Sequence, residues 1–176
     1  MNKTTPGDKL VLACNQGDEK LLKNVLYHHD DDINEVRDST GNTLLNICTC
    51  KGYLNCVKVL VSLAADANAV NADGNNALHI AVIYDQMDCL AYFLSTWGGV
   101  LVNERNNRGY SPLHIAVHCE GYAAIEILLS SRKVYLDIAD DSGWTPVASC
   151  AIKGNIPCLK LMMERGADID MSLLFH

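Results

Sequence analysis

The stretch His118-Cys119-Glu120 places an imidazole, a thiol and a carboxylate on three consecutive residues. An imidazole beside a thiol can activate a nucleophile, and the three groups together could also ligate a metal ion. Consecutive residues of a helix, however, point about 100° apart, so these side chains do not converge on one atom. We therefore assign no catalytic residue, no metal ion and no cofactor to this stretch.

Sequence motifs that carry other chemistry are absent. The chain contains no Gly-x-x-x-x-Gly-Lys-Ser/Thr, no Gly-x-Gly-x-x-Gly, no His-Glu-x-x-His and no Gly-x-Ser-x-Gly. These motifs mark phosphate loops, dinucleotide sites, zinc proteases and serine hydrolases respectively. The sequence therefore favours a protein that is not an enzyme.

A repeated segment defines the elements that would position these side chains. Its clearest copy is Gly109-Tyr110-Ser111-Pro112-Leu113-His114-Ile115-Ala116-Val117, with related copies after Gly41, Gly74 and Gly143 and a degenerate copy at Asp8. Equivalent residues (Asp8, Thr43, Asn76, Ser111 and Thr145) are separated by 35, 33, 35 and 34 residues. Serine or threonine can cap a helix whose first position is proline, where a missing N–H costs nothing. Each copy therefore predicts a helix start.

The repeated segment resembles the helix-opening motif of the ankyrin repeat, Thr-Pro-Leu-His-x-Ala, and its spacing is close to the ankyrin period of about 33 residues. The resemblance implies an all-α fold, an ankyrin-repeat solenoid of five helix-turn-helix repeats with hairpin-like loops. We expect residues 1–7 to form an N-terminal lead-in and residues 8–176 a single ankyrin-repeat domain. The repeats would span about 8–42, 43–75, 76–110, 111–144 and 145–176.

Within this register, several side chains are predicted to be structural. His79 and His114 fall where, in the ankyrin family, the imidazole hydrogen-bonds within and between loops. An inward ladder is expected from Leu45, Leu78, Leu113 and Val147. Equivalent interior positions, which accept small apolar residues, carry Cys48 and Cys150 in the first helices and Cys56, Cys89 and Cys158 in the second helices. We therefore expect the cysteines to be free thiols, as in a reducing compartment.

The charge balance bears on the partner. Lysine and arginine number 14 against 21 aspartate and glutamate, so the net charge is 14 minus 21, or −7, with no basic stripe. Direct binding to nucleic acid is not expected. No run of about 18 apolar residues and no apolar N-terminal segment occurs, so we expect no membrane association. The expectation is a cytoplasmic monomer, present in the nucleus as well, that binds another protein, and a basic segment of that protein would suit the acidic field.

In ankyrin proteins the partner usually lies on the concave face formed by the loop tips and the first helices. The resemblance marks tip residues for this role: Arg37, Asp38, Asn42, Asn71, Asp73, Asn75, Arg105, Asn107, Arg108, Tyr110, Asp140, Asp141 and Trp144. On the first helices it marks Lys51, Tyr84, His118 and Lys153. Tyr110 and Trp144 hold the same position of successive repeats, and Tyr, Trp and Arg are enriched in binding hot spots. We expect these two aromatics to stand side by side, flanked by Arg105 and Arg108.

These features favour a non-catalytic adaptor or scaffold, and two alternatives stay open. The segments 52–69 and 77–82 resemble repeats of the inhibitor-of-NF-kappa-B family, which would imply sequestration of a Rel-type transcription factor. The chain could instead be the ankyrin part of a larger enzyme or of a ubiquitin-ligase substrate receptor. Family resemblance also implies asparaginyl hydroxylation where Leu precedes Asn by eight positions, as before Asn34 and Asn68.

Overall fold

The computed structural model describes residues 5–28, 32–96 and 102–167. Within these ranges the chain forms ten helices that pair in sequence order. The helices are α1 (Pro6–Gln16), α2 (Glu19–Tyr27), α3 (Leu44–Cys50), α4 (Leu54–Ser62), α5 (Ala77–Ile83), α6 (Met87–Thr96), α7 (Pro112–His118), α8 (Tyr122–Ser130), α9 (Pro146–Lys153) and α10 (Ile156–Glu164). The only strand-like pairing among the described residues is one isolated bridge between Arg37 and Thr43.

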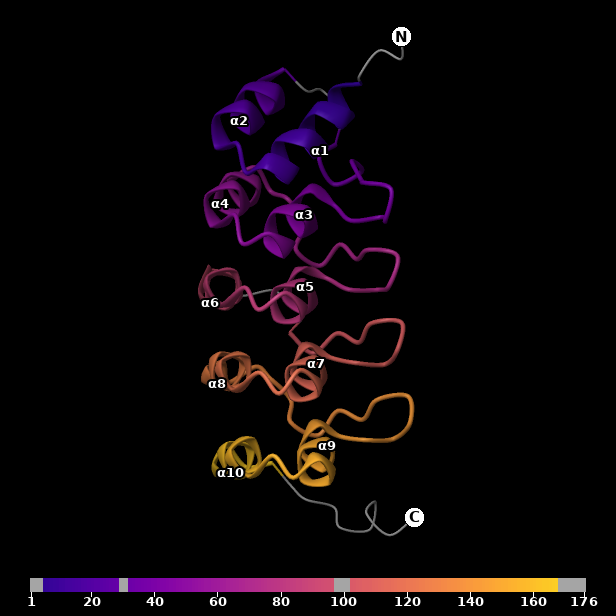
Figure 1. Ribbon diagram of the computed structural model, residues 1–176, viewed down its shortest axis with the longest axis vertical. Coiled ribbons are helices and arrows are strands. Elements are labelled where there is room, and N and C mark those ends of the chain that lie inside the picture. Colours follow the sequence, from indigo (N-terminus) through magenta and orange to yellow (C-terminus); the bar gives the residue numbers. More distant parts are fainter. Residues whose placement is uncertain (1–4, 29–31, 97–101, 168–176) are drawn as a thin grey trace.

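The helix pairs stack into a column. The first helices α1, α3, α5, α7 and α9 form one row, and the second helices form a parallel row beside it (Figure 1). Long loops project from the first row on the side away from the second row, one above another (Figure 1). Each helix packs on its partner in the repeat and on the equivalent helix of the next repeat. The predicted all-α repeat solenoid is confirmed.

Helix starts follow the predicted caps. The side chains of Thr43, Asn76, Ser111 and Thr145 each accept a hydrogen bond from the backbone N–H of the third helical residue. The first helix departs from the prediction, because Thr5 is its cap and Pro6 its first residue. Thr5 and Asp8 form a reciprocal capping box, with bonds of 3.1 and 2.8 Å. The predicted lead-in over residues 1–7 was therefore wrong at its end, since Pro6 and Gly7 belong to α1.

The core runs the length of the stack. The expected ladder is buried, with exposures of 0 to 1% for its members Leu45, Leu78, Leu113 and Val147. The five cysteines expected in the interior (Cys48, Cys56, Cys89, Cys150 and Cys158) are also buried. All eight cysteines of the chain are free thiols. The apolar core therefore forms by the stacking of repeats, because a single repeat is too small to bury its own apolar side chains.

Turns between paired helices require a left-handed residue. Glycine supplies it at three of the five turns, but Asp85 and Glu120 do so at the others, with φ of 55° and 56°. At the fourth turn the strained residue is thus Glu120 and not the neighbouring Gly121. Ala64, after α4, has φ of 62° where the equivalent Gly166 has 90°. No described helix is long and apolar enough to cross a membrane.

Candidate protein-binding site

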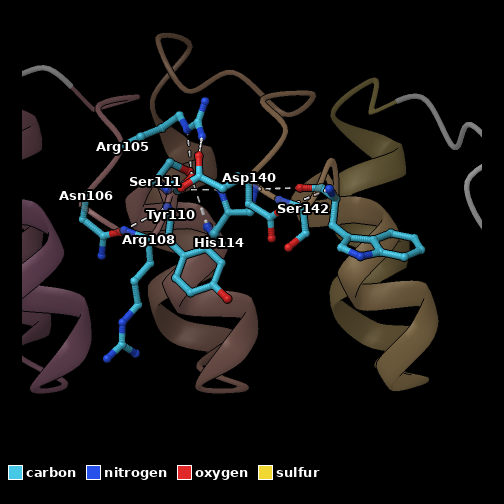
Figure 2. Close-up of polar contacts among 11 residues, drawn as sticks. Arg105, Asn106, Arg108, Tyr110, Ser111, His114, Asp140 and Ser142 are labelled. Atoms are coloured by element: carbon cyan, nitrogen blue, oxygen red, sulfur yellow. Dashed lines mark hydrogen bonds and ion pairs between the residues drawn. The ribbon is translucent and has the colours of Figure 1, made fainter.

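Each loop tip is shaped by one asparagine or aspartate. In the third tip, the backbone N–H groups of Arg108 and Tyr110 donate to the side-chain oxygen of Asn106 at 3.0 and 3.1 Å (Figure 2). In the fourth tip, Asp140 accepts the corresponding bonds from Ser142 and the residue two positions later, at 2.8 and 2.9 Å. Asp38 and Asn71 do the same in the first two tips. These side chains close their own turns and so hold the tips rigid.

Amide side chains tie successive tips together in the first part of the stack. Asn71 donates to Asn42 of the preceding tip at 2.9 Å, and Asn106 donates to Asn75 at 2.8 Å. Tyr110 and Trp144 occupy the positions equivalent to Asn42 and Asn75. An aromatic side chain therefore stands where the earlier repeats use an amide for folding.

Tip glycines let neighbouring loops approach closely. A Cβ atom added at Gly74 would lie 2.7 Å from the backbone nitrogen of Asn107, and one added at Gly109 would lie 2.5 Å from that of Asp141. Both glycines also have a positive φ, of 77° and 76°. The third and fourth tips are thus fixed against their neighbours before any partner arrives.

Two buried histidines connect the helices to the tips. The Nε2–H of His79 donates to the carbonyl of Tyr110 at 3.0 Å, which leaves Nδ1 to accept the N–H of Asn76 at 3.3 Å. His114 repeats the arrangement, with its Nε2–H donating to the carbonyl of Trp144 at 3.1 Å. Burial lowers the pKa of His79 to about 4 and also lowers the pKa of His114. Both imidazoles are therefore neutral and structural, as predicted.

A hollow of about 340 Å³ opens between the second and third tips and the helices α5 and α7 that follow them. Ile83, Ile115 and the rings of Tyr110 and His118 provide its apolar surface. The Tyr110 ring centroid lies 4.7 Å from that of His118 and 6.0 Å from that of His114. Tyr110 is half-buried and packs on the core, so its orientation is set by the fold.

The hollow brings together six of the predicted binding residues: Asp73, Asn75, Asn107, Arg108, Tyr110 and His118. Figure 2 shows the Tyr110 ring and the Arg108 side chain extending from the tip in the same direction, while Arg105 extends to the other side. Arg105 donates to the carbonyl of Gly109 at 3.0 Å and forms an ion pair with Asp141. Arg105 and Asp141 are thus engaged with one another across two tips.

Other predicted residues lie outside the hollow. Lys153 donates to the carbonyl of His118 at 3.0 Å, and Tyr84 is 49% exposed at the end of α5. Trp144 is half-buried in the fourth tip. Asp140 is only 9% exposed and its carboxylate closes its own turn, so we leave it out of the proposed surface.

The sequence reasoning missed Ile83 and Ile115, the apolar wall of the hollow. A signal for Ile83 exists, because it lies seven residues after its helix cap, the same register as His118. Burial lowers the pKa of His118, and the nearby Lys153 lowers it further. No group of three or more His, Cys, Asp or Glu side chains that could hold a metal ion occurs in the described part of the chain.

The described chain is a stack of repeats. Its rigid tips and first helices form one face, and this face contains the hollow. A sequence profile for ankyrin repeats in three copies matches residues 10–106 and 98–172. The chain belongs to the ankyrin-repeat family, whose fold serves protein interaction.

Three curated relatives show how widely the family likeness extends. The chain is 26% identical over 164 residues to the target of rapamycin complex 2 subunit AVO2 of Saccharomyces cerevisiae, covering 92% of this chain and 38% of that protein. It is 27% identical to the nuclear factor NF-kappa-B p105 subunit of Mus musculus, covering 74% of this chain and 14% of that protein. It is 26% identical to the B-cell lymphoma 3 protein homolog of Mus musculus, with coverage of 79% and 32%. The chain thus spans less than half the length of each.

Proposed function

We propose that this chain is a non-catalytic adaptor or scaffold that binds another protein on the concave face formed by the tips and first helices of repeats three to five. The observation that carries the proposal is the hollow around Tyr110. Its aromatic ring stands where the earlier tips have a folding amide, and it lies beside an exposed arginine. Aromatic and arginine side chains in shaped pockets are the usual anchors of protein interfaces.

The test replaces the aromatics by a residue that the equivalent positions of other tips already carry. Asparagine is the residue at the same position in the first two tips, so Tyr110→Asn/Trp144→Asn keeps a side chain that this turn accepts. Partners captured from a cell lysate should bind the double variant about 30-fold more weakly, because hot-spot truncation costs about 2 kcal/mol. Tyr122→Asn makes the same change on α8, in the second row of helices, and should leave binding unaltered.

The outcomes separate the alternatives. A partner that binds the double variant as tightly as the natural chain would move the site elsewhere. Loss of helical circular dichroism in the variant would show that the aromatics serve packing. Capture of a kinase or of a ubiquitin-ligase subunit would favour an adaptor role. Weakening of the complex by salt would support a basic partner segment for this chain of net charge −7.

Sequestration of a Rel-type transcription factor is the second candidate function. The matches to the NF-kappa-B p105 subunit and to the B-cell lymphoma 3 protein homolog favour it. Titration of the chain with a purified Rel-type factor should give saturable binding that Tyr110→Asn weakens. An absence of binding at micromolar concentrations would remove this candidate.

We also propose that the chain acts as a monomer in the cytoplasm and the nucleus, without direct contact with nucleic acid or membrane. Eight free thiols support a reducing compartment, because disulfides form and persist in oxidising ones. Sedimentation equilibrium checks the monomer, and microscopy of the fluorescently tagged chain checks the compartment. A dimer, or staining confined to a secretory organelle, would contradict these proposals.

A further inference from the structure

We propose that the hollow selects a partner segment in which an apolar side chain lies between a basic side chain and an acidic side chain. The basic side chain would lie against Asp73, the apolar side chain would enter the hollow, and the acidic side chain would pair with Arg108. This inference rests on the proposed function, because it names the chemistry of the partner at the same site.

Two opposite charges on the rim of the hollow are uncommitted. Asp73, in the second tip, and Arg108, in the third tip, are both exposed and both line the hollow. The backbone N–H of each donates to a tip asparagine, but neither the carboxylate nor the guanidinium has a hydrogen bond or an ion pair with any described residue. Both charged groups are therefore available to a partner.

Four other charged residues near this face are engaged within the protein. Arg105 and Asp141 neutralise one another, and Asp140 closes its own turn. Lys153 is bonded to the carbonyl that ends α7. Among the described residues that line the hollow, Asp73 is thus the free anion and Arg108 the free cation, and they come from neighbouring repeats.

The hollow that the two charges flank has an apolar part beside three asparagines, Asn75, Asn106 and Asn107. Ile83 and Ile115 line it together with the Tyr110 ring, which is held against the rings of two histidines. The space of about 340 Å³ is enough for an aliphatic side chain of leucine size. A partner residue of that kind would gain from burial here, whereas a charged one would lose hydration.

The two rim charges also set the register of the segment. They stand on tips that touch, because the backbone N–H of Asn107, next to Arg108, donates to the carbonyl of Asp73 at 3.0 Å. Side chains at alternate positions of an extended segment point to the same face. The partner should therefore carry its apolar residue between its two charged residues, with one residue that faces away on each side of the apolar one.

Three synthetic peptides test this inference. Each has a leucine with one charged residue two positions before it and another two positions after it, in a Gly/Ser background, and the charges are Lys with Glu, Lys with Lys, or Glu with Glu. Each is titrated at about 0.15 M salt, which limits the reach of the net charge to about 8 Å. The natural chain should bind the mixed peptide about tenfold more tightly than the other two, because two exposed ion pairs replace one pair and one repulsion.

Charge-reversal variants should change which of the three peptides binds most tightly. Asp73→Lys should prefer the Glu/Glu peptide, and Arg108→Glu should prefer the Lys/Lys peptide. The double variant Asp73→Lys/Arg108→Glu should prefer the mixed peptide again. A matched control, Asp88→Lys/Arg132→Glu, makes the same changes at exposed positions in α6 and in the loop after α8, and should behave as the natural chain.

Two results would overturn the inference. One is equal or tighter binding of the Lys/Lys peptide by the natural chain, and the other is a failure of all three peptides to bind at a concentration of about 1 mM. The proposed function would survive either result if Tyr110→Asn/Trp144→Asn still lost its captured partners. Retention of those partners by that double variant would count against the proposed function instead.

Discussion

Replacing Asn46 by histidine should stabilise the stack. Asn46 is the third residue of α3, the position that His79 and His114 hold in α5 and α7. Those imidazoles reach the carbonyl just before the next helix cap, at 3.0 and 3.1 Å. Asn46 is 1% exposed, and its side-chain oxygen and nitrogen have no hydrogen-bond partner among the described residues. Its amide therefore carries an uncompensated desolvation cost.

The size of the effect follows from these contacts. A buried polar group without a partner costs about 1–3 kcal/mol, and a new hydrogen bond to the carbonyl of Asn75 would contribute about 1 kcal/mol. The histidine ring is larger than the asparagine side chain, and crowding at this buried position offsets part of the gain in stability. We expect the free energy of unfolding of Asn46→His to rise by about 2 kcal/mol. For a chain of this size, that corresponds to about 4–8 °C in melting temperature.

Urea unfolding followed by circular dichroism measures this difference. Asn46→Ala is the matched control, because alanine occupies the same position in α9 as Ala148. Alanine removes the unpaired amide but adds no bridge, so its stability should fall between those of the natural chain and Asn46→His. Asn46→His less stable than both would show that the site cannot admit a ring, and the reasoning from the other repeats would fail.

Three further predictions follow from the same structure. Because burial holds the pKa of His79 at about 4, below the value of about 6.5 in the unfolded chain, the unfolded state binds more protons between these pH values. Stability should be complete above pH 6.5 and should fall by about 3 kcal/mol as the pH drops to 4, a loss that His79→Asn should reduce in urea titrations. Ala64→Gly should raise the melting temperature, because relief of φ at 62° outweighs the added chain entropy by about 0.5–1 kcal/mol; a lower melting temperature would contradict this. Co-expression with an asparaginyl hydroxylase should add oxygen to Asn34 or Asn68, which intact mass detects, and Asn34→Ala/Asn68→Ala should abolish the gain; no added mass on the natural chain would refute it.

Most of the fold could be predicted because the same local sequence signals recur from one repeat to the next. Four cap residues and two prolines mark the starts of the first helices, and apolar side chains recur at equivalent positions. The start of α1 was missed because the regular period pointed to Asp8. Thr5-Pro6-Gly7-Asp8 carries both a capping box and a first-position proline, a local signal that outweighs the period.

The candidate site was predicted less completely, because it depends on contacts between repeats. Arg108, Tyr110 and His118 could be named from their positions, but the pairing of Arg105 with Asp141 joins two different tips. Asp140 looked like a surface charge in isolation. Its equivalence to Asn106 could have revealed the turn-closing role, since both accept the same two backbone bonds.

The hollow lies across a junction, with one wall on α5 and the tip before it and the other on α7 and its tip. In a stack whose units hold only their neighbours, unfolding can begin at any weak junction and spread outward. A ligand bound there would hold two repeats together, so that they unfold as one unit. Ligand binding would then slow amide hydrogen exchange in the repeats on both sides of that junction. Binding would also determine at which junction the stack of repeats begins to unfold.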